Sequence, residues 1–284
     1  MKINWHSENM PNMHVNEKEG VTFLTYPAFE EMPEIVHGFS TRLGGVSEGI
    51  YSSMNLSFTR GDKEEAVKEN YRRISSAMGF EMENIVTSDQ THTANVRRVT
   101  EEDRGNGITK PRPYKDVDGM ITNVPGIVLA TFYADCVPLY FVDPVQKAIG
   151  LSHSGWRGTV SKIGKITVEK MSEEYGTRPE ELYAAVGPSI CQKCYEVSED
   201  VAEEFRRAFD PKYWNTLFYK KENGKYQLNL WEANRIVLLE SGIPEDHISM
   251  PNLCTCCNPE FLFSHRASKG KRGNLGAFLG IRRN

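Results

Sequence analysis

The sequence predicts an α+β protein that folds as one large domain, and three observations support this prediction. The chain has 284 residues, which is long for one domain and short for two. Its 39% hydrophobic and 25% charged residues are ordinary for a globular protein. Strand-like and helix-like segments follow one another without strict β-α-β alternation, which favours antiparallel or mixed sheets.

The expected elements of the first half begin with a short apolar strand over residues 35–40. A helix should follow Asp62, which is a suitable N-cap, and should end at Gly79. Residues 100–115 are polar and rich in glycine and proline, so an exposed loop is expected there.

The second half carries the strongest strand signals. Apolar, β-rich segments cover residues 127–133, 137–142 and 148–153, and Asp143 begins the turn between the last two. The remaining expected elements are a helix from Thr159 or Ser161 to near Gly176, a buried strand over 182–187, a helix after Ser198 and a helix over 230–241.

The net charge and the distribution of apolar residues indicate which classes of protein to expect. A net charge of -4 gives no indication of nucleic-acid binding. Residues 1–12 have neither an apolar run nor a cleavage pattern, so we expect a cytoplasmic protein. The longest apolar stretch, residues 126–142, contains Asp135 and is shorter than the roughly 20 apolar residues of a membrane span.

The hairpin formed by residues 137–142 and 148–153 brings a cysteine and a histidine together. If residues 143–146 form the connection, Cys136 lies directly opposite His153, with Cβ atoms about 4.5–5.5 Å apart. That distance suits two ligands of one metal or a Cys–His catalytic pair. A connection one residue longer would instead place Ser154 opposite Cys136.

The best candidate for a third ligand is His92, in a polar segment that follows an apolar one. Two histidines and one cysteine with an open fourth position form a catalytic zinc set. Zinc in such a site lowers the pKa of bound water to about 7 or polarises a substrate oxygen. In the alternative interpretation, Cys136 is an ordinary buried residue and the histidines belong to the core or the surface.

Two arginines are candidates for binding an anion. Arg157 lies where a strand passes through glycines into a helix, and free backbone N–H groups at such a position can hold an anion. Arg42 precedes another glycine-rich turn. The alternatives are a tight turn with Trp156 in the core and a solvated loop arginine. The basic segment 269–272 is either a mobile loop or a cover over an anionic ligand.

The other cysteines lie in two clusters, Cys191-Gln192-Lys193-Cys194 and Cys254-Thr255-Cys256-Cys257. In a chain without export signals, clustered cysteines are more often metal-binding or reactive than disulfide-bonded. They could form a structural zinc site together, or they could be reduced thiols packed near the active site, which is the preferred interpretation.

A set of ordered motifs resembles the YfiH-like, laccase-domain family, from about residue 21 to the end, which leaves residues 1–20 as an N-terminal tail and 21–284 as one catalytic domain. The motifs are His37-Gly38-Phe39-Ser40-Thr41-Arg42-Leu43-Gly44-Gly45-Val46-Ser47, Asn55-Leu56-Ser57, Gln90-Thr91-His92, Asp118-Gly119, Ala134-Asp135-Cys136-Val137-Pro138, His153-Ser154-Gly155-Trp156-Arg157-Gly158, Gly187-Pro188-Ser189-Ile190, Cys194-Tyr195-Glu196-Val197, and Cys254-Thr255 with Phe263-Ser264-His265-Arg266.

The resemblance implies a four-layer α/β/β/α fold with mixed sheets and zinc ligands at His92, Cys136 and His153. It implies a purine nucleoside phosphorylase acting on adenosine, inosine and methylthioadenosine, with adenosine deaminase activity. The chain departs from the family pattern at Cys191, at Lys193, and at His265, where the family more often has tyrosine.

This resemblance also implies roles for particular residues. Purine nucleosides and phosphate are the expected partners, without nucleic acid or membrane, and a homodimer is the assembly considered. Arg42 and Arg157 are the candidates for the phosphate, and Gln90, in the same motif as His92, is a candidate for substrate contact. Asp135 or a metal-bound water could supply the proton to the departing base.

Three other functions remain as alternatives. A copper-dependent polyphenol oxidase of the multicopper type needs about ten histidines for its copper sites, whereas this chain has seven. A single Cu²⁺ could still occupy the zinc site, because Cu²⁺ binds more tightly than Zn²⁺ to many such ligand sets. A metal-free cysteine hydrolase would use Cys136 as nucleophile and His153 as base. A non-enzymatic role has no support among the residues.

Overall fold

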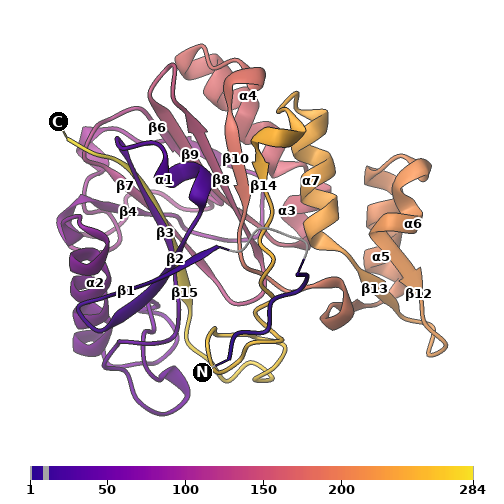
Figure 1. Cartoon of the computed structure of the whole chain (residues 1–284), viewed down its shortest axis with the longest axis horizontal. Coiled ribbons are helices and arrows are strands. Elements are labelled where there is room, and N and C mark those ends of the chain that lie inside the picture. Colours follow the sequence, from indigo (N-terminus) through magenta and orange to yellow (C-terminus); the bar gives the residue numbers. More distant parts are fainter. Residues whose placement is uncertain (1, 9–12, 284) are drawn as a thin grey trace.

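The computed structural model describes residues 2–8 and 13–283. Two six-stranded sheets lie face to face, and helices cover the outer face of each (Figure 1). The layers therefore run α/β/β/α within a single domain, and the predicted fold class is confirmed. In the part of the chain that the structure describes, no helix is long and apolar enough to span a membrane.

The first sheet is antiparallel except at one edge, where β4 runs parallel to β7. The central strand β15 comes from the end of the chain and pairs with both β3 and β7. In spatial order its strands are β1 (His14–Lys18), β2 (Val21–Thr25), β3 (Ile35–Ser40), β15 (Leu275–Ile281), β7 (Val128–Tyr133) and β4 (Ile85–Thr87).

The second sheet is antiparallel at its centre and parallel at both edges. Its central pair, β8 and β9, is the hairpin that the sequence predicted. In spatial order its strands are β14 (Ile248–Ser249), β10 (Tyr183–Val186), β8 (Val137–Asp143), β9 (Ala148–Ser154), β6 (Gly119–Thr122) and β5 (Val96–Arg98).

A third, small sheet lies with two helices beyond α7, at the right of Figure 1. Its strands are β11 (Glu196–Val197), β13 (Tyr226–Leu228) and β12 (Phe218–Lys220). The α-helices are α1 (Pro27–Glu30), α2 (Glu64–Met78), α3 (Trp156–Val160), α4 (Ile163–Tyr175), α5 (Glu199–Ala208), α6 (Trp214–Leu217) and α7 (Leu230–Glu240). Short 3-10 helices cover Gly49–Tyr51, Met82–Asn84, Glu101–Asp103, Pro179–Glu181, Gln192–Cys194, Pro211–Tyr213 and Glu245–His247.

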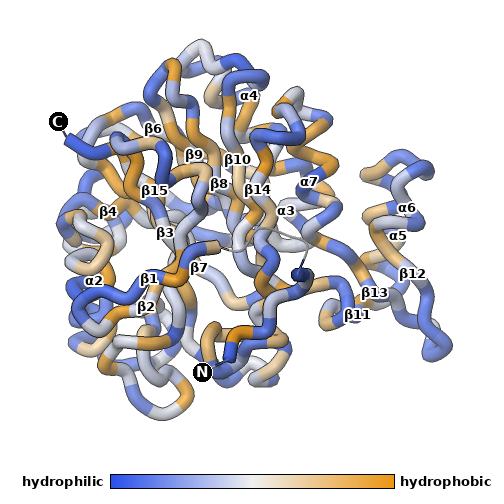
Figure 2. The backbone as a smooth tube through the Cα atoms, viewed as in Figure 1, coloured by the Kyte–Doolittle hydropathy of each residue, from blue (hydrophilic) through white to orange (hydrophobic). Residues whose placement is uncertain are grey.

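Strand β8 shows why its sequence is apolar without interruption. Tyr140 and Val142 pack in the core between the two sheets, whereas Leu139 and Phe141 pack under the helices α4 and α7. A strand buried on both faces needs apolar residues at every position. Figure 2 shows the same distribution, with hydrophobic residues along the strands and hydrophilic ones at outer turns such as the β12–β13 connection.

The N-terminal segment is more than the tail that the sequence suggested. Residues His14–Lys18 form β1, which pairs along its whole length with β2. Trp5 forms an isolated bridge with Leu253. The segment was hard to recognise because β1 is an exposed edge strand whose polar residues carry no apolar alternation.

The hairpin register differs from both predicted alternatives. His153 lies opposite Pro138 rather than Cys136, and Ser154 lies opposite Val137. The cause is Asp143, which belongs to the strand, and whose carboxylate accepts hydrogen bonds from the N–H groups of Val145 and Gln146, both at 2.9 Å. The turn therefore covers residues 144–147. The pairing moves by two residues, so Cys136 and His153 remain on the same face of the sheet.

The helix predicted after His153 is divided into two. It begins earlier than expected, at Trp156, and is interrupted after Val160, where Lys162 has a positive φ of 58°. The second helix, α4, ends at Gly176 as predicted.

Candidate active site

Three side chains from separate elements meet at one end of the interface between the sheets. His92 lies in the loop between β4 and β5, Cys136 directly precedes β8, and His153 lies near the end of β9. Their ligand atoms all lie within 4.8 Å of one another. The set runs from the exposed His92 through the half-buried Cys136 to the buried His153. Two imidazoles and a thiol at this separation fit a single metal ion that keeps an open position.

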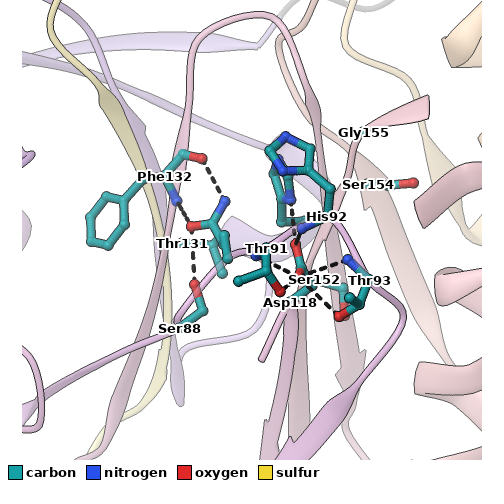
Figure 3. A network of polar contacts seen from close by, with 12 residues as sticks. Ser88, Thr91, His92, Thr93, Asp118, Thr131, Phe132, Ser152, Ser154 and Gly155 are labelled. Atoms are coloured by element: carbon teal, nitrogen blue, oxygen red, sulfur yellow. Dashed lines mark hydrogen bonds and ion pairs between the residues drawn. The ribbon is translucent and has the colours of Figure 1, made fainter. Parts of the chain in front are cut away.

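One carboxylate, that of Asp118 before β6, positions both histidines. Its Oδ1 lies 2.7 Å from Nδ1 of His153, which leaves Nε2 of that ring free to ligate a metal ion. The backbone N–H groups of Thr91, His92 and Thr93 donate to the same carboxylate at 2.9–3.2 Å (Figure 3). Metal-binding histidines commonly require such a partner to fix the ring and its tautomer.

The electrostatics of the group favour a thiolate. Burial alone would raise the pKa of Cys136, but the charge and hydrogen bond of His153, followed by those of His92, lower it to about 6. Burial lowers the pKa of His153, but Cys136 and Asp118 outweigh it and raise that pKa. For Asp118, burial raises the pKa, and hydrogen bonds from His153, Thr93 and Thr91 lower it to about 2. Metal-binding cysteines bind as thiolates, so this environment suits a ligand.

The three side chains lie in the wall of a cavity of about 880 Å³. Phe58 and Phe132, both half-buried, are aromatic residues of its lining. The cavity also collects positive charge, since its lining includes Arg60, Lys68, Lys110, Arg112 and Arg272, against the acidic Glu64 and Asp89. Cavities of this size and mixed lining are typical of sites for small ligands.

Arg272 is the most enclosed of these basic residues. It is 9% exposed, and its Nε has no hydrogen-bond partner in the structure. Burial lowers the pKa of Arg272 to about 10, with a further lowering by the nearby charge of Arg60, whereas Asp135 and Cys136 act in the opposite direction. The positive charges of Arg272 and Arg60 repel each other, and an anion bound by both guanidinium groups would relieve this repulsion.

Gln90 and Asp135, both predicted as site residues, make structural contacts. The amide of Gln90 lines the cavity but exchanges two hydrogen bonds, of 2.8 and 2.7 Å, with the backbone of Phe132. The carboxylate of Asp135 accepts from the Thr255 hydroxyl at 2.6 Å and from the Arg266 N–H at 2.7 Å. Asp135 lies outside the cavity lining, and its contacts hold the C-terminal segment against the turn before Cys136.

The structure does not bring Arg42 or Arg157 into the cavity lining. The guanidinium of Arg42 donates to the carbonyls of Ser52 and Pro259 and lies 4.8 Å from the ring centre of Phe263. Arg157 is exposed, with its guanidinium 4.3 Å from the ring centre of Trp156. A local motif identifies an arginine near a ligand but not the direction of its side chain.

The sequence did not predict a role in the candidate site for Asp118 or Arg60. Asp118 lies in the Asp118-Gly119 motif, and the need of a metal-bound histidine for a hydrogen-bond acceptor could have identified it. Arg272 belongs to the basic segment 269–272, for which the sequence left open a mobile loop or a cover over an anionic ligand. For Gly155 the sequence left open an anion-binding loop and a tight turn, but it did not predict that a Cβ there would lie 3.1 Å from His92 Cδ2 and 3.2 Å from Cys136 Sγ.

Comparison with known proteins finds relatives that match most of this chain. Purine nucleoside phosphorylase YlmD of Bacillus subtilis is 37% identical over 250 residues, covering 88% of this chain and 89% of that protein. Adenosine deaminase RL5, from an unknown prokaryotic organism, is 34% identical over 243 residues, covering 84% and 91%. The crystal structure of YlmD from Geobacillus stearothermophilus matches with a TM-score of 0.89 and 36% identity, covering 96% and 100%.

The family described as multi-copper polyphenol oxidoreductase laccase matches residues 36–282. This match spans most of the chain and contains every side chain of the His92, Cys136 and His153 group. The predicted resemblance is thereby confirmed, and the chain belongs to this family.

Proposed function

We propose that this protein is a zinc-dependent purine nucleoside phosphorylase that acts on adenosine, inosine and methylthioadenosine and also deaminates adenosine. The observation that carries the proposal is the meeting of His92, Cys136 and His153 in the wall of a cavity that also holds two neighbouring arginines. The names of the relatives from Bacillus subtilis and of RL5 support the two activities. Six free cysteines suit a reducing compartment, and we propose the cytoplasm.

The proposed ligands are His92, Cys136 and His153, which fit zinc by donor type and separation. When bound, zinc supplies a Lewis acid and makes water a nucleophile at neutral pH. Asp118 holds the Nδ1 proton of His153 and fixes the loop of His92, so that both rings are aligned before substrate arrives.

For phosphorolysis, we propose that Arg272 and Arg60 bind phosphate in the cavity. An oxygen of hydrogen phosphate then attacks C1′ of the ribose, the bond from C1′ to the purine nitrogen breaks, and the purine takes up the proton that the phosphate loses. Holding phosphate next to the ribose makes the step effectively unimolecular. The rings of Phe58 and Phe132 offer apolar faces on which a flat purine could lie.

The test is a chromatographic assay with purified, zinc-loaded protein. With inosine and phosphate, the expected products are hypoxanthine and ribose 1-phosphate in equal amounts, and without phosphate neither should form. With adenosine, inosine and ammonia should also appear, independently of phosphate. If no phosphate-dependent hypoxanthine forms at any pH from mildly acidic to mildly alkaline, the phosphorylase proposal is wrong.

Copper remains a competing metal because of the description of the family. In residues 2–8 and 13–283, two groups of side chains could hold a metal, and only one of them contains histidine. The cavity lining includes no methionine that could serve as the axial ligand of a blue-copper site. We therefore propose zinc, and elemental analysis of protein purified without added metal distinguishes the two.

A metal-free cysteine hydrolase is the second candidate, favoured by one observation. Cys136, His153 and Asp118 form a hydrogen-bonded series in the order of a nucleophile, a base and an orienting acid. His92, however, converges on the same sulfur and has no role in such a mechanism. Metal-stripped protein treated with an activated ester tests this candidate, since an acyl group on Cys136, detected by mass spectrometry, would support it.

A further inference from the structure

A second group of potential metal ligands lies outside the cavity. Cys191 and Cys194 belong to the segment after β10, and Cys254 and Cys257 to the segment after β14. All four sulfur atoms lie within 4.8 Å of one another. The Sγ of Cys257 is 4.0 Å from that of Cys191 and 3.5 Å from that of Cys194.

These separations match one tetrahedral metal ion and not disulfide bonds. Four thiolates at about 2.3 Å from zinc have their sulfurs about 3.8 Å apart. The sulfurs of a disulfide lie about 2.05 Å apart, and all six cysteines are free. An iron–sulfur cluster, whose several irons and sulfides must fit between its cysteines, would need wider spacing than this group offers.

The spacing along the chain supports the same conclusion. Each pair is a Cys-x-x-Cys element, the usual half of a four-cysteine zinc site. The structure selects Cys257 as the partner of Cys254 and leaves the adjacent Cys256 outside the group. The N–H of Cys191 donates to Sγ of Cys254 at 3.2 Å, a bond that stabilises a thiolate.

We propose that Cys191, Cys194, Cys254 and Cys257 bind one structural zinc ion, separate from the metal of the cavity. Four protein sulfurs complete the tetrahedral shell and leave no position for water or substrate, which is the mark of a structural site. The interpretation preferred from sequence, reduced thiols packed near the active site, gives no reason for this geometry. The inference does not depend on which reaction the cavity catalyses.

The zinc would join two distant parts of the chain next to the active site. Ser189 and Cys254 form a bridge, and the N–H of Thr255 donates to the Ser189 carbonyl at 3.1 Å. The hydroxyl of Thr255 donates to Asp135, which precedes Cys136 in the chain. The ion would thus fix the segment between β14 and β15, yellow in Figure 1, against the turn that carries a ligand of the cavity.

The test is the zinc content per chain of purified, folded variants, measured by inductively coupled plasma mass spectrometry. Wild-type protein should contain two zinc ions, Cys257→Ser one, Cys136→Ser one, and the double variant none. Cys256→Ser is the matched control, because it removes a thiol of the same segment that lies outside the group, and it should keep both ions.

This experiment distinguishes an error in the four-cysteine site from an error in the cavity site. One zinc in wild-type protein that disappears in Cys136→Ser would overturn the structural site and leave the cavity site standing. One zinc that survives in Cys136→Ser and disappears in Cys257→Ser would support the structural site while contradicting zinc in the cavity. Equal zinc loss in Cys256→Ser and Cys257→Ser would also overturn the assignment.

A spectroscopic readout identifies the ligands directly. Cobalt(II) added to metal-stripped Cys136→Ser protein should give the strong thiolate-to-metal and tetrahedral bands of a four-sulfur site. Cys257 is exposed, so its replacement should leave the circular dichroism of the fold unchanged while weakening these bands and lowering Tm. Absence of these bands in Cys136→Ser, or iron in place of zinc in the purified protein, would contradict the proposal.

Discussion

Asp118 connects the two histidines of the candidate site more directly than any sequence pattern indicated. Both of its oxygens accept hydrogen bonds, Oδ1 from His153 and His92, and Oδ2 from Thr91 and Thr93. Its side chain is 0% exposed. A neutral amide cannot satisfy all these donors, because one of its two ends is itself a donor. Asp118 therefore fixes the positions of His92 and His153, the two histidines that we propose as metal ligands.

Asp118→Asn should weaken zinc binding to the cavity by about 10- to 100-fold, since the loss of such partners typically costs that much. Competition with a chelator of known affinity measures the change. Asp116→Asn is the matched control, because Asp116 accepts from the side chains of Thr91, Thr93 and Asn95 in the same loop without contacting His153. Comparable weakening in both variants would mean that the loop, rather than the Asp118–His153 bond, controls the metal.

Arg272 is the second residue whose role can be isolated. Arg272→Lys keeps a positive charge but loses the planar fork, so KM for phosphate should rise by about 10- to 100-fold. Deamination of adenosine uses no phosphate and should change much less. The reactions are compared by steady-state kinetics on one preparation.

Arg157→Ala tests the arginine that the sequence favoured, and it should affect both reactions little because Arg157 is exposed and outside the cavity lining. A larger rise in phosphate KM for Arg157→Ala than for Arg272→Lys would return the phosphate site to Arg157. A parallel loss of both activities and of Tm in Arg272→Lys would instead show that Arg272 supports the scaffold.

At the level of the elements, the β8–β9 hairpin determines which side chains can share a metal. The strand pairing differs from the predicted one by two residues. Because side chains alternate between the faces of a sheet with a period of two, Cys136 and His153 still lie on the same face. A difference of one residue would have turned Cys136 or His153 to the other face. The loop of His92 then completes the group from a strand of the opposite sheet, held there by Asp118.

The connection from β9 to α3 needs the absence of a side chain at Gly155. Its backbone, with φ -71° and ψ 178°, is open to any residue, so the constraint is steric. In Gly155→Ala the new methyl would lie 3.1 Å from the His92 ring and 3.2 Å from the Cys136 sulfur. The His92 ring and the Cys136 sulfur must each shift by a few tenths of an ångström. The affinity of the cavity for zinc should therefore decrease by about tenfold.

Gly158→Ala is the control for Gly155→Ala, because its methyl would approach a backbone carbonyl at 3.3 Å and no ligand side chain. Chelator competition and Tm are measured for both variants. Equal metal affinity in Gly155→Ala and wild-type protein would show that the site adapts to the added methyl, contrary to expectation.

At the scale of the whole molecule, the stability of the protein at acid pH should depend on the buried carboxylate of Asp118. The pKa of Asp118 is about 2 in the folded protein, below its ordinary value of 3.8. Because the pKa of Asp118 is lower in the folded protein, its ionised carboxylate stabilises the fold at pH values above 3.8. This stabilisation is lost as the pH falls toward about 2. The free energy of unfolding of metal-free protein should therefore decrease between about pH 4 and about pH 2.

Asp118→Asn isolates this contribution, because the other acidic groups are common to both proteins. The difference in unfolding free energy between wild type and Asp118→Asn, from denaturant titrations, should be constant between about pH 4 and about pH 6, below the ordinary pKa of the His153 partner, and should narrow below about pH 4. A difference that is independent of pH over this range would contradict the pKa assigned to Asp118.

Local patterns in the sequence determined much of this protein. Apolar runs predicted strands at 35–40, 127–133, 137–142 and 148–153, and each is present within a residue or so. Gly79 ends α2 in the left-handed conformation that favours glycine. Cys136 and His153 were paired from the hairpin alone, since a hairpin is a local structure whose connection length nearly fixes the register.

Only the tertiary structure decided what depends on contacts between distant segments. Asp118, Arg60 and Arg272 come from three separate loops, and no periodicity along the chain relates them. The direction of an arginine side chain likewise depends on neighbours far away in sequence, which is why Arg42 reaches the Pro259 carbonyl instead of the cavity. The four cysteines are two local pairs that become one group only because β10 and β14 are adjacent strands. Folding supplies these contacts by burying apolar faces between the layers, so they follow from the packing as a whole.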